Sequence, residues 1–538
     1  MKKSNSQHSL KTYNILNTSS LPLLILVFMF VSCSSKSAYQ NYESVVYQTS
    51  QAGDNLKLIT SNDAKPTSTE IKKVALQLLP NEEFQKYYGF GASFTESSAW
   101  NLATIPVDLR KNVLTKLFSP TEGAGFTLTR THINSSDYSN THYTYIEDGD
   151  EDLSTFSINE DLKGFTGEEN EQVQGVELIE PSYDLIPMIL EASSIPGADI
   201  KIIASPWSPP SWMKTGETLE MTNGTLQPKY YGLWAKYLSK YVSAYAEKGI
   251  KLWGITPQNE PLHYHDARWD SNGFTPEQGR DFLRDYLGPQ LVKDGHLDLN
   301  DLDSGLHVLI YDHNKSTMND YVAPTYQDPE AAKYVWGTAF HWYANSELKE
   351  NNWYAEELSK LQKNWPNKGI IHSESSIDLD ASAPIAQYWR ESTDYAGTFI
   401  PFETYAYDII TDLNHGTQGY VEWCSILSDK GQPNPYDNFN SAPILINPVT
   451  DEVIYTPLYY LLSHFSKFIR PGAYRITLKG EELKGLIYTA AKNPDGSIAI
   501  VVYNNNEEGY EVSIKLETKT YTSEIAAKAI ETIILQDK

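Results

Sequence analysis

The chain of 538 residues is poor in cysteine and in positive charge. Only Cys33 and Cys424 are present, which is too few for a framework of disulfide bonds. The 43 lysines and arginines are outnumbered by 69 aspartates and glutamates, so the formal net charge is −26. This excess of negative charge argues against nucleic acid or an anionic membrane surface as the partner of the folded part, and a neutral ligand fits better.

The sequence also lacks an apolar run long enough to span a bilayer comfortably. The run from Leu21 to Val31 is too short, and it lies between an N-terminal segment with three lysines and a group of small residues around Cys33. This order predicts a lipoprotein signal peptide over residues 1–32 with lipidation at Cys33. An ordinary signal peptide with an incidental cysteine is the alternative. Either way we expect export, with a lipid as the only membrane anchor, to the outer membrane or periplasmic side of a Gram-negative bacterium.

Aromatic residues are abundant. There are 37 tyrosines and 12 tryptophans, and aromatic residues make up 12% of the chain. They fit a protein that stacks flat apolar faces on rings, although large β-rich proteins carry many aromatics in any case. The length predicts two or more domains.

The middle of the sequence alternates short apolar runs with longer helical patterns. Eight runs have the character of β-strands: Tyr88 to Ser93, Phe126 to Thr131, Lys201 to Ala204, Lys251 to Thr256, His307 to Tyr311, Val335 to Phe340, Gly369 to Ser373 and Gly419 to Cys424. Eight strand-helix units predict an α/β fold with a (β/α)₈ barrel over residues 81–455. The alternative is a doubly wound open sheet, but no glycine-rich phosphate loop follows the first strand.

The segments on either side of the barrel are predicted to form one all-β sandwich. Residues 33–54 are polar and are expected to be a tether, and residues 55–80 contain alternating runs typical of strands. Beyond about Tyr455 the helical patterns stop, and residues 456–538 are typical of short strands. The turn sequence from Asn493 to Gly496 favours a hairpin there. We expect the strands of residues 55–80 to join this C-terminal sandwich.

Polar and aromatic residues end nearly all of the predicted barrel strands. Side chains at the carboxyl ends of barrel strands face the active site. In chain order these residues are Arg130, Asn134, Ser135, Asp137, Trp207, Trp212, Asn259, Glu260, Asp312, His313, His341, Trp342, Tyr343, Glu374 and Trp423. Any one of them has an ordinary explanation as a cap or a core polar residue, but together they predict an active site.

Two carboxylates in this set fit the cleavage of a glycosidic bond. That reaction needs a proton for the leaving oxygen and a nucleophile or negative charge at the anomeric carbon. Glu260 and Glu374 end the fourth and seventh strands, nearly opposite across an eight-membered ring. A separation of about 5 Å would make the enzyme retaining, with a covalent glycosyl intermediate.

Other strand-end residues suit a sugar. Arg130 or His341 would keep the nucleophile ionised, and Asn259 would hydrogen-bond a 2-hydroxyl. Trp207 and Trp423 would stack on the apolar faces of a pyranose ring. The run from His263 to Asp266 admits a metal cluster, but a rim surface is the favoured interpretation.

Several ordered motifs resemble family 30 of the glycoside hydrolases, which includes lysosomal glucocerebrosidase and microbial β-1,6-glucanases. The motifs are Phe90 to Glu96, Arg130 with Ser136 to Ser139, Ser205 to Thr215, Trp253 to Pro261, Gly273 to Glu277, His341 to Tyr343, His372 to Ser375, Asp437 to Pro443 and His464 to Ile469. The likeness runs from about Tyr88 to the C-terminus.

The resemblance implies a β-sandwich packed on the barrel and no metal or cofactor. It assigns Glu260 as acid/base and Glu374 as nucleophile. The residues implied to bind substrate are Arg130, Asp137, Trp207, Asn259, His341, Tyr343, Trp423, Asn438 and Phe439. Departures from the family pattern at Ser375, Ser376 and Asn314 bear on the substrate more than on the reaction.

The sequence therefore predicts a retaining hydrolase of β-glucosidic bonds, with β-1,6-glucan or β-1,6-linked glucose branches as the favoured substrate. Glucosylceramide, a β-xyloside and a β-fucoside are alternatives that differ in pocket shape. A non-catalytic glycan-binding lipoprotein is the alternative from another class, but a binding protein has no need of both Glu260 and Glu374. The sequence gives no expectation for the oligomeric state.

Overall fold

The computed structural model describes residue 39 and residues 41–60, 71–216, 221–265, 267–343, 352–377, 400–436, 438–481 and 483–538. Residues 41–538 form one unit, to which the following description applies. The expected signal peptide and Cys33 lie outside the described residues, so lipid anchoring stays a prediction. Within the described residues, no helix combines the length and apolar character that crossing a membrane requires.

Eight parallel strands form the barrel. Their bounds are β4 Gly89–Ser93, β5 Leu128–Ile133, β6 Lys201–Pro206, β7 Gly254–Ile255, β8 His307–Asn314, β9 Gly337–His341, β10 Gly369–Glu374 and β11 Gly419–Cys424. Hydrogen bonds join them in the order β4-β11-β10-β9-β8-β7-β6-β5. The ring closes where Phe94 bridges Thr131 and donates its backbone N–H to the Arg130 carbonyl at 2.8 Å. The predicted (β/α)₈ barrel is confirmed.

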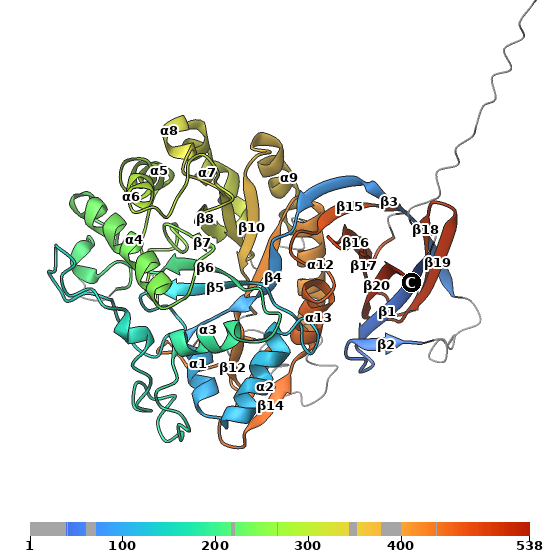
Figure 1. Ribbon diagram of the computed structural model, residues 1–538, viewed down its shortest axis with the longest axis horizontal. Coiled ribbons are helices and arrows are strands. Elements are labelled where there is room, and N and C mark those ends of the chain that lie inside the picture. The colour runs from blue at the N-terminus through green and yellow to red at the C-terminus, as the bar shows by residue number, and fades with distance from the viewer. Residues whose placement is uncertain are drawn as a thin grey trace, which may run out of the picture. The chain divides into compact units, whose positions relative to one another are not determined.

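Helices follow the barrel strands and cover the outside of the ring (Figure 1). Their bounds are α1 Glu96–Ala103, α2 Val107–Phe118, α3 Leu185–Ser193, α4 Tyr231–Glu247, α5 Pro276–Phe282, α6 Gly288–Lys293, α7 Met318–Gln327, α8 Pro329–Ala332, α9 Ala355–Asn364, α12 Ile400–Asn414 and α13 Pro457–Ser466. Local sequence sets their starts. At α5, for example, Thr275 and Gln278 form a reciprocal capping box and Pro276 occupies the first turn.

Nine further strands form a second sheet, in the order β19-β18-β3-β15-β16-β17-β20-β1-β2. Their bounds are β1 Tyr42–Ser50, β2 Lys57–Ile59, β3 Lys72–Lys86, β15 Tyr474–Gly480, β16 Leu486–Lys492, β17 Ile498–Asn504, β18 Tyr510–Leu516, β19 Lys519–Ile525 and β20 Ala529–Asp537. β3 pairs with β15 and β18, and β1 pairs with β20 along its whole length. The strands that precede the barrel therefore do join the C-terminal sheet, as expected.

This sheet folds over on itself. Ser523 on the edge strand β19 donates a hydrogen bond of 2.9 Å to the Glu531 carboxylate on β20, although five strands lie between β19 and β20 in the sheet order. The fold-over gives two layers from one sheet and encloses a row of apolar side chains between them. A separate three-stranded sheet, β12 Ile426–Ser428, β13 Ile444–Asn447 and β14 Glu452–Tyr455, was not predicted.

Two expectations about the ends of the barrel are wrong. Residues 42–50, expected within the tether, form β1. They pair with β20 over nine residues, and the local polarity of these residues does not reveal a partner so distant in the sequence. Residues 457–466, expected to be β-structure, form α13. This helix is almost entirely buried, so it lacks the polar face by which a helix is recognised in a sequence.

The buried helix α13 also holds the second sheet. The His464 Nδ1 lies 2.8 Å from the Thr532 hydroxyl on β20, and its Nε2 lies 2.9 Å from the Thr49 hydroxyl on β1. Burial lowers the pKa of His464 to about 3, so the ring is neutral and both nitrogens are satisfied by hydroxyl groups.

A pH-dependent stability is expected from Glu531. Burial raises its pKa to about 8, against the hydrogen bond from Ser523, whereas an unfolded glutamate titrates near ~4.3. The folded state therefore binds the extra proton between these values, and its stability falls as the pH rises through this window. Glu531→Gln should remove that dependence and raise the free energy of unfolding at pH 9 by about a few kcal/mol. Urea unfolding at pH 5 and pH 9 measures it.

The matched control is Glu517→Gln on an exposed turn, which should leave the difference between the two pH values unchanged. An unaltered pH dependence in Glu531→Gln would show that the carboxyl group is ionised in the folded protein.

Candidate active site

A cavity of about 280 Å³ lies at the carboxyl ends of the barrel strands. Its lining consists of Asp137, Trp207, Asn259, Glu260, His263, Arg268, Trp269, His313, Asn314, Tyr343, Glu374, Trp423, Asn438 and Asn440. The volume is near the lower end of the range for small-molecule sites. Most of the residues predicted from strand ends therefore meet around one space.

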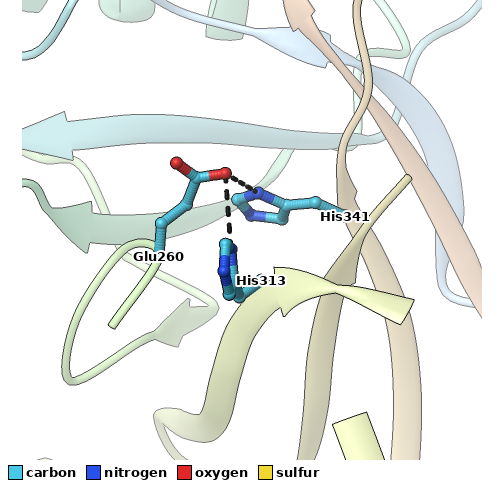
Figure 2. Close-up of side chains that lie close together, drawn as sticks. All are labelled: Glu260, His313 and His341. Carbon is cyan, nitrogen blue, oxygen red and sulfur yellow. Dashed lines mark hydrogen bonds and ion pairs between the residues drawn. The ribbon is translucent and has the colours of Figure 1, made fainter. Parts of the chain in front are cut away.

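Glu260 reaches this cavity through an unusual backbone turn. It follows the short strand β7 and has a φ of 45°, in the left-handed region that non-glycine residues rarely adopt. Its N–H donates to the Asp312 carbonyl at 2.9 Å, which holds the turn in place. The Oε1 atom lies 3.2 Å from His341 Nδ1 and 3.5 Å from His313 Nδ1 (Figure 2). Two imidazoles therefore contact one carboxylate oxygen.

Glu374 ends β10 and is buried at the bottom of the cavity. The Arg130 guanidinium donates to its Oε2 through Nη1, and the Tyr343 hydroxyl donates to its Oε1 at 3.0 Å. Both carboxylate oxygens therefore accept a hydrogen bond from the protein. This arrangement fits an ionised carboxylate.

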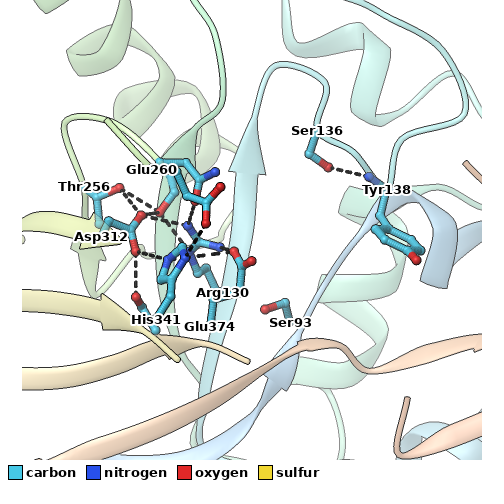
Figure 3. A network of polar contacts seen from close by, with 12 residues as sticks. Ser93, Arg130, Ser136, Tyr138, Thr256, Glu260, Asp312, His341 and Glu374 are labelled. Atoms are coloured by element: carbon cyan, nitrogen blue, oxygen red, sulfur yellow. Dashed lines mark hydrogen bonds and ion pairs between the residues drawn. The ribbon is translucent and has the colours of Figure 1, made fainter. Parts of the chain in front are cut away.

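Asp312 lies beside Thr256, His341 and Arg130 and connects the groups of the site (Figure 3). It is fully buried, and every contact that it makes comes from a donor. Its Oδ2 accepts from Arg130 Nη2 at 2.7 Å, Thr256 at 2.8 Å and Ser205 at 3.0 Å, and its Oδ1 accepts from Ser373 at 2.6 Å and His341 Nε2 at 3.0 Å. Burial acts to raise the pKa of Asp312, but Arg130 and His341 outweigh it and the pKa is lowered. Asp312 is thus a permanent anion.

His341 and Glu260 compete for one proton in the site. Burial lowers the pKa of His341, but the surrounding carboxylates, Glu374 first, raise it to about 9. Burial acts to raise the pKa of Glu260, but hydrogen bonds from His313 and His341 outweigh it and the pKa is lowered. In the free site the proton therefore resides on imidazole, one hydrogen bond away from Glu260, and the pair titrates as a unit.

Burial also raises the pKa of Glu374, against the attraction of His341 and Arg130. A raised pKa alone would favour a protonated side chain, but the buried guanidinium of Arg130 lies directly against Oε2 and favours the anion. The contacts decide the matter, and we take Glu374 as ionised near neutral pH.

Trp207 and Trp423 form one wall of the cavity. Their rings stack on each other with centroids 4.8 Å apart and planes at 21°. They therefore cannot hold a pyranose ring between them. The guanidinium of Arg130 lies over both rings, 4.7 and 5.4 Å from their centroids, so the tryptophans also fix that arginine.

Asp137 lies in the lining of the cavity and is nearly fully buried. Burial, and then Glu374 and Glu260, raise its pKa well above the ordinary value. Its Oδ1 has no hydrogen-bond partner among the described residues. A buried oxygen with this unmet capacity suits the hydroxyl group of a ligand.

Not all predicted residues line the cavity. Arg130 and His341 lie behind the lining and act on it through Glu374 and Glu260. Asn259 lines the cavity, but its Oδ1 already accepts from Arg130 Nη2 at 2.7 Å. Phe439 packs against the hydrophobic core instead.

The rim contains residues that strand ends did not reveal. Arg268, Trp269 and Asn440 come from loops; Asn440 lies within the motif Asp437 to Pro443, whereas nothing in the local sequence marks Arg268 or Trp269. His263, expected on a rim surface, stacks on Trp269 with centroids 5.2 Å apart and planes at 21°. His263 and Trp269 thus form a flat platform on the Glu260 side of the cavity, while Asp266 lies outside the described residues.

Comparisons with known proteins agree with this geometry. The model of the glycosyl hydrolase family 30 TIM-barrel domain matches residues 87–469, and the model of the glycosyl hydrolase family 30 beta sandwich domain matches residues 472–533. The lysosomal acid glucosylceramidase of Mus musculus is 30% identical over 87% of this chain and 84% of the relative. The endo-1,6-beta-D-glucanase neg1 of Aspergillus fumigatus is 26% identical over 81% of each chain.

Solved structures give the same result. The endo-beta1,6-glucanase BT3312 superposes with a TM-score of 0.73 and 26% identity, covering 91% of this chain and 99% of that one. SrfJ from Salmonella typhimurium, at 24% identity and a TM-score of 0.75, shares the fold. Both domains, their order and the cavity at the strand ends point the same way: the chain belongs to glycosyl hydrolase family 30 and is a hydrolase of that family.

Proposed function

We propose that the protein is a retaining glycoside hydrolase that cleaves β-glucosidic bonds by double displacement, with Glu374 as nucleophile and Glu260 as acid/base. The observation that supports this mechanism is the position of His341, whose imidazole lies within 4 Å of both carboxylates. Such closeness suits the short carboxylate separation of retaining enzymes. The two carboxylates also differ in their partners as the two roles require.

In the first step an oxygen of Glu374 attacks the anomeric carbon, and the bond to the leaving oxygen breaks. Arg130 and Tyr343 hold Glu374 ionised and aim it. The leaving oxygen takes its proton from Glu260, which receives that proton from His341 across their 3.2 Å contact, so that the step leaves Glu260 as a carboxylate and His341 neutral. The products are the leaving alcohol and a glycosyl ester of Glu374.

In the second step water attacks the anomeric carbon of the ester. Glu260 removes the proton from the water, and Glu374 leaves as a carboxylate. Two inversions at the same carbon give a product with the original β configuration. Asn259, fixed by Arg130, lies in the lining where it can contact the 2-hydroxyl of the sugar.

We further propose β-1,6-glucan, or β-1,6-linked glucose branches, as the substrate. The supporting observation is the rim on the Glu260 side, where the leaving group must lie. It presents His263 stacked on Trp269, with Arg268 beside them. A flat ring among polar groups suits a sugar as leaving group better than the apolar chains of a lipid.

Glucosylceramide is the second candidate, because several relatives at about 30% identity are named glucosylceramidase or putative glucosylceramidase. The similarity to proteins named endo-1,6-β-glucanase favours the first candidate, β-1,6-glucan. Incubation with gentiobiose, β-1,6-glucan, branched β-1,3/1,6-glucan, glucosylceramide and an aryl β-xyloside, with product analysis by NMR, distinguishes the candidates. Release of β-glucose from glucosylceramide but not from the glucans would overturn the substrate proposal.

The nucleophile is tested with Glu374→Gln. Glutamine keeps the shape but cannot form the glycosyl ester, so kcat/KM for an aryl β-glucoside should fall by a factor of at least about 10³. Glu277→Gln, at the start of α5 and outside the lining of the cavity, is the matched control and should keep its activity. Circular dichroism checks that both variants fold. Full hydrolysis by Glu374→Gln would refute the mechanism.

The acid/base is tested with Glu260→Ala. An aryl glucoside whose leaving group is a stable anion needs no proton, so formation of the intermediate should remain fast while its hydrolysis becomes slow. Added azide should then attack the intermediate and give a β-glucosyl azide. Equal losses for good and poor leaving groups, with no azide product, would contradict this role.

The rim is tested with Trp269→Ala. If Trp269 carries the leaving sugar, kcat/KM for β-1,6-glucan should fall by about 10-fold or more, while kcat/KM for an aryl β-glucoside should change much less. The ratio of the two constants is the measurement. Equal effects on both substrates would refute the proposal that Trp269 binds the leaving sugar.

A further inference from the structure

Glu260, His313 and His341 form a group of metal-ligand type. Each side chain offers one ligand atom, a carboxylate oxygen or a ring nitrogen, and the three atoms lie within 4.8 Å of one another. The two imidazole nitrogens approach the same carboxylate oxygen, from β8 and β9 (Figure 2). Three strand ends of a rigid barrel therefore hold this group in place.

The spacing fits a tetrahedral ion. Zinc binds imidazole nitrogen and carboxylate oxygen at about 2.0–2.2 Å, which places neighbouring ligands of a tetrahedron about 3.4 Å apart. The observed separations from Glu260 Oε1 are 3.2 Å and 3.5 Å. Two histidines and one glutamate, with a fourth position open to a cavity, are a known zinc donor set.

The surroundings of His341 support this interpretation. Its second nitrogen, Nε2, lies 3.0 Å from Asp312 Oδ1, so a carboxylate fixes the ring orientation and leaves Nδ1 for an ion. Histidine ligands of metals characteristically have such a carboxylate partner. The ion would not be isolated from solvent, because Glu260 and His313 both line the cavity.

The charge also favours a cation. Asp312, Glu374 and Glu260 gather around this point, and the Arg130 guanidinium faces Asp312 and Glu374. A second candidate cluster, His372 with Asp408 and Asp412, does not share this property. There the ammonium of Lys315 already lies 2.6 Å from each aspartate and takes the place of an ion.

We propose that Glu260, His313 and His341 bind a divalent transition-metal ion of the Zn²⁺ type, and that the bound ion inhibits the hydrolase. Binding of the ion to Nδ1 of His341 displaces the proton of that nitrogen into solvent, and the Glu260 oxygen donates its electron pair to the metal. That oxygen then carries no proton for the leaving group. The inhibitory effect rests on the proposed role of Glu260, whereas the binding does not. The ion is an inhibitor and not a cofactor of the reaction.

Calorimetry with ZnCl₂ tests the binding. The protein, without a histidine tag, is freed of metal with EDTA and titrated, and one tight site is expected. His313→Ala should weaken that site at least about 10-fold. His263→Ala removes an imidazole that lines the same cavity outside the cluster, and should leave the affinity unchanged. Mg²⁺, which prefers oxygen ligands, should not compete.

Two further measurements test the metal site without relying on His313→Ala alone. Co²⁺ in place of Zn²⁺ should give the visible absorption of a tetrahedral site in the unaltered protein, and Glu260→Gln should lose it. Zn²⁺ should inhibit hydrolysis of an aryl β-glucoside, with recovery after EDTA.

The outcomes separate the two proposals. Binding that depends on His313, without any glycosidase activity, supports the metal site and refutes the proposed function. Activity without tight Zn²⁺ binding, or binding of equal affinity in His313→Ala, overturns the metal site and leaves the proposed function in place.

Discussion

The buried ion pair between Arg130 and Asp312 is the constraint on which the active site depends. Taking both charges out of water costs several kcal/mol for each, and the cost is offset only if every donor and acceptor is satisfied. The site meets this condition, because Asp312 accepts from residues on five strand ends and Arg130 donates to Asp312, Asn259 and Glu374. Satisfying the pair therefore fixes the positions of the two catalytic candidates.

The same pair organises the protons. Asp312 and Glu374 raise the proton affinity of His341, and Arg130 keeps Glu374 anionic, so the mobile proton is directed to the Glu260 side of the cavity. The proposed nucleophile and the proposed acid thus differ by their partners, although both are buried glutamates. Two imidazoles on one carboxylate oxygen can hold either a proton or a metal ion, so the proposed sensitivity to transition metals would follow from the way the proposed acid receives its proton.

Much of this site could be predicted because barrel geometry converts position along a strand into position in space. Glu260, Glu374 and Arg130 were found from strand ends alone, and eight strands were placed within a few residues. Contacts between distant segments were not visible: the stacking of Trp207 on Trp423, and the pairing of β1 with β20. The buried helix α13 carries no polar face, so its local pattern was ambiguous. In each of these cases tertiary packing determined a feature of the structure that the local sequence pattern did not specify.

The division between strand ends and loops also separates reaction from specificity. Residues that contact Asp312 come from strand ends and cannot change singly without leaving a buried charge unsatisfied. His263, Arg268 and Trp269 come from the loop between β7 and α5, outside that network. The rim can therefore vary while the chemistry stays constant, which is how one family can include enzymes named for a glycolipid and for a glucan. For this chain the leaving group that Glu260 is proposed to protonate must accordingly be deduced from the rim, where the flat ring of Trp269 argues for a sugar.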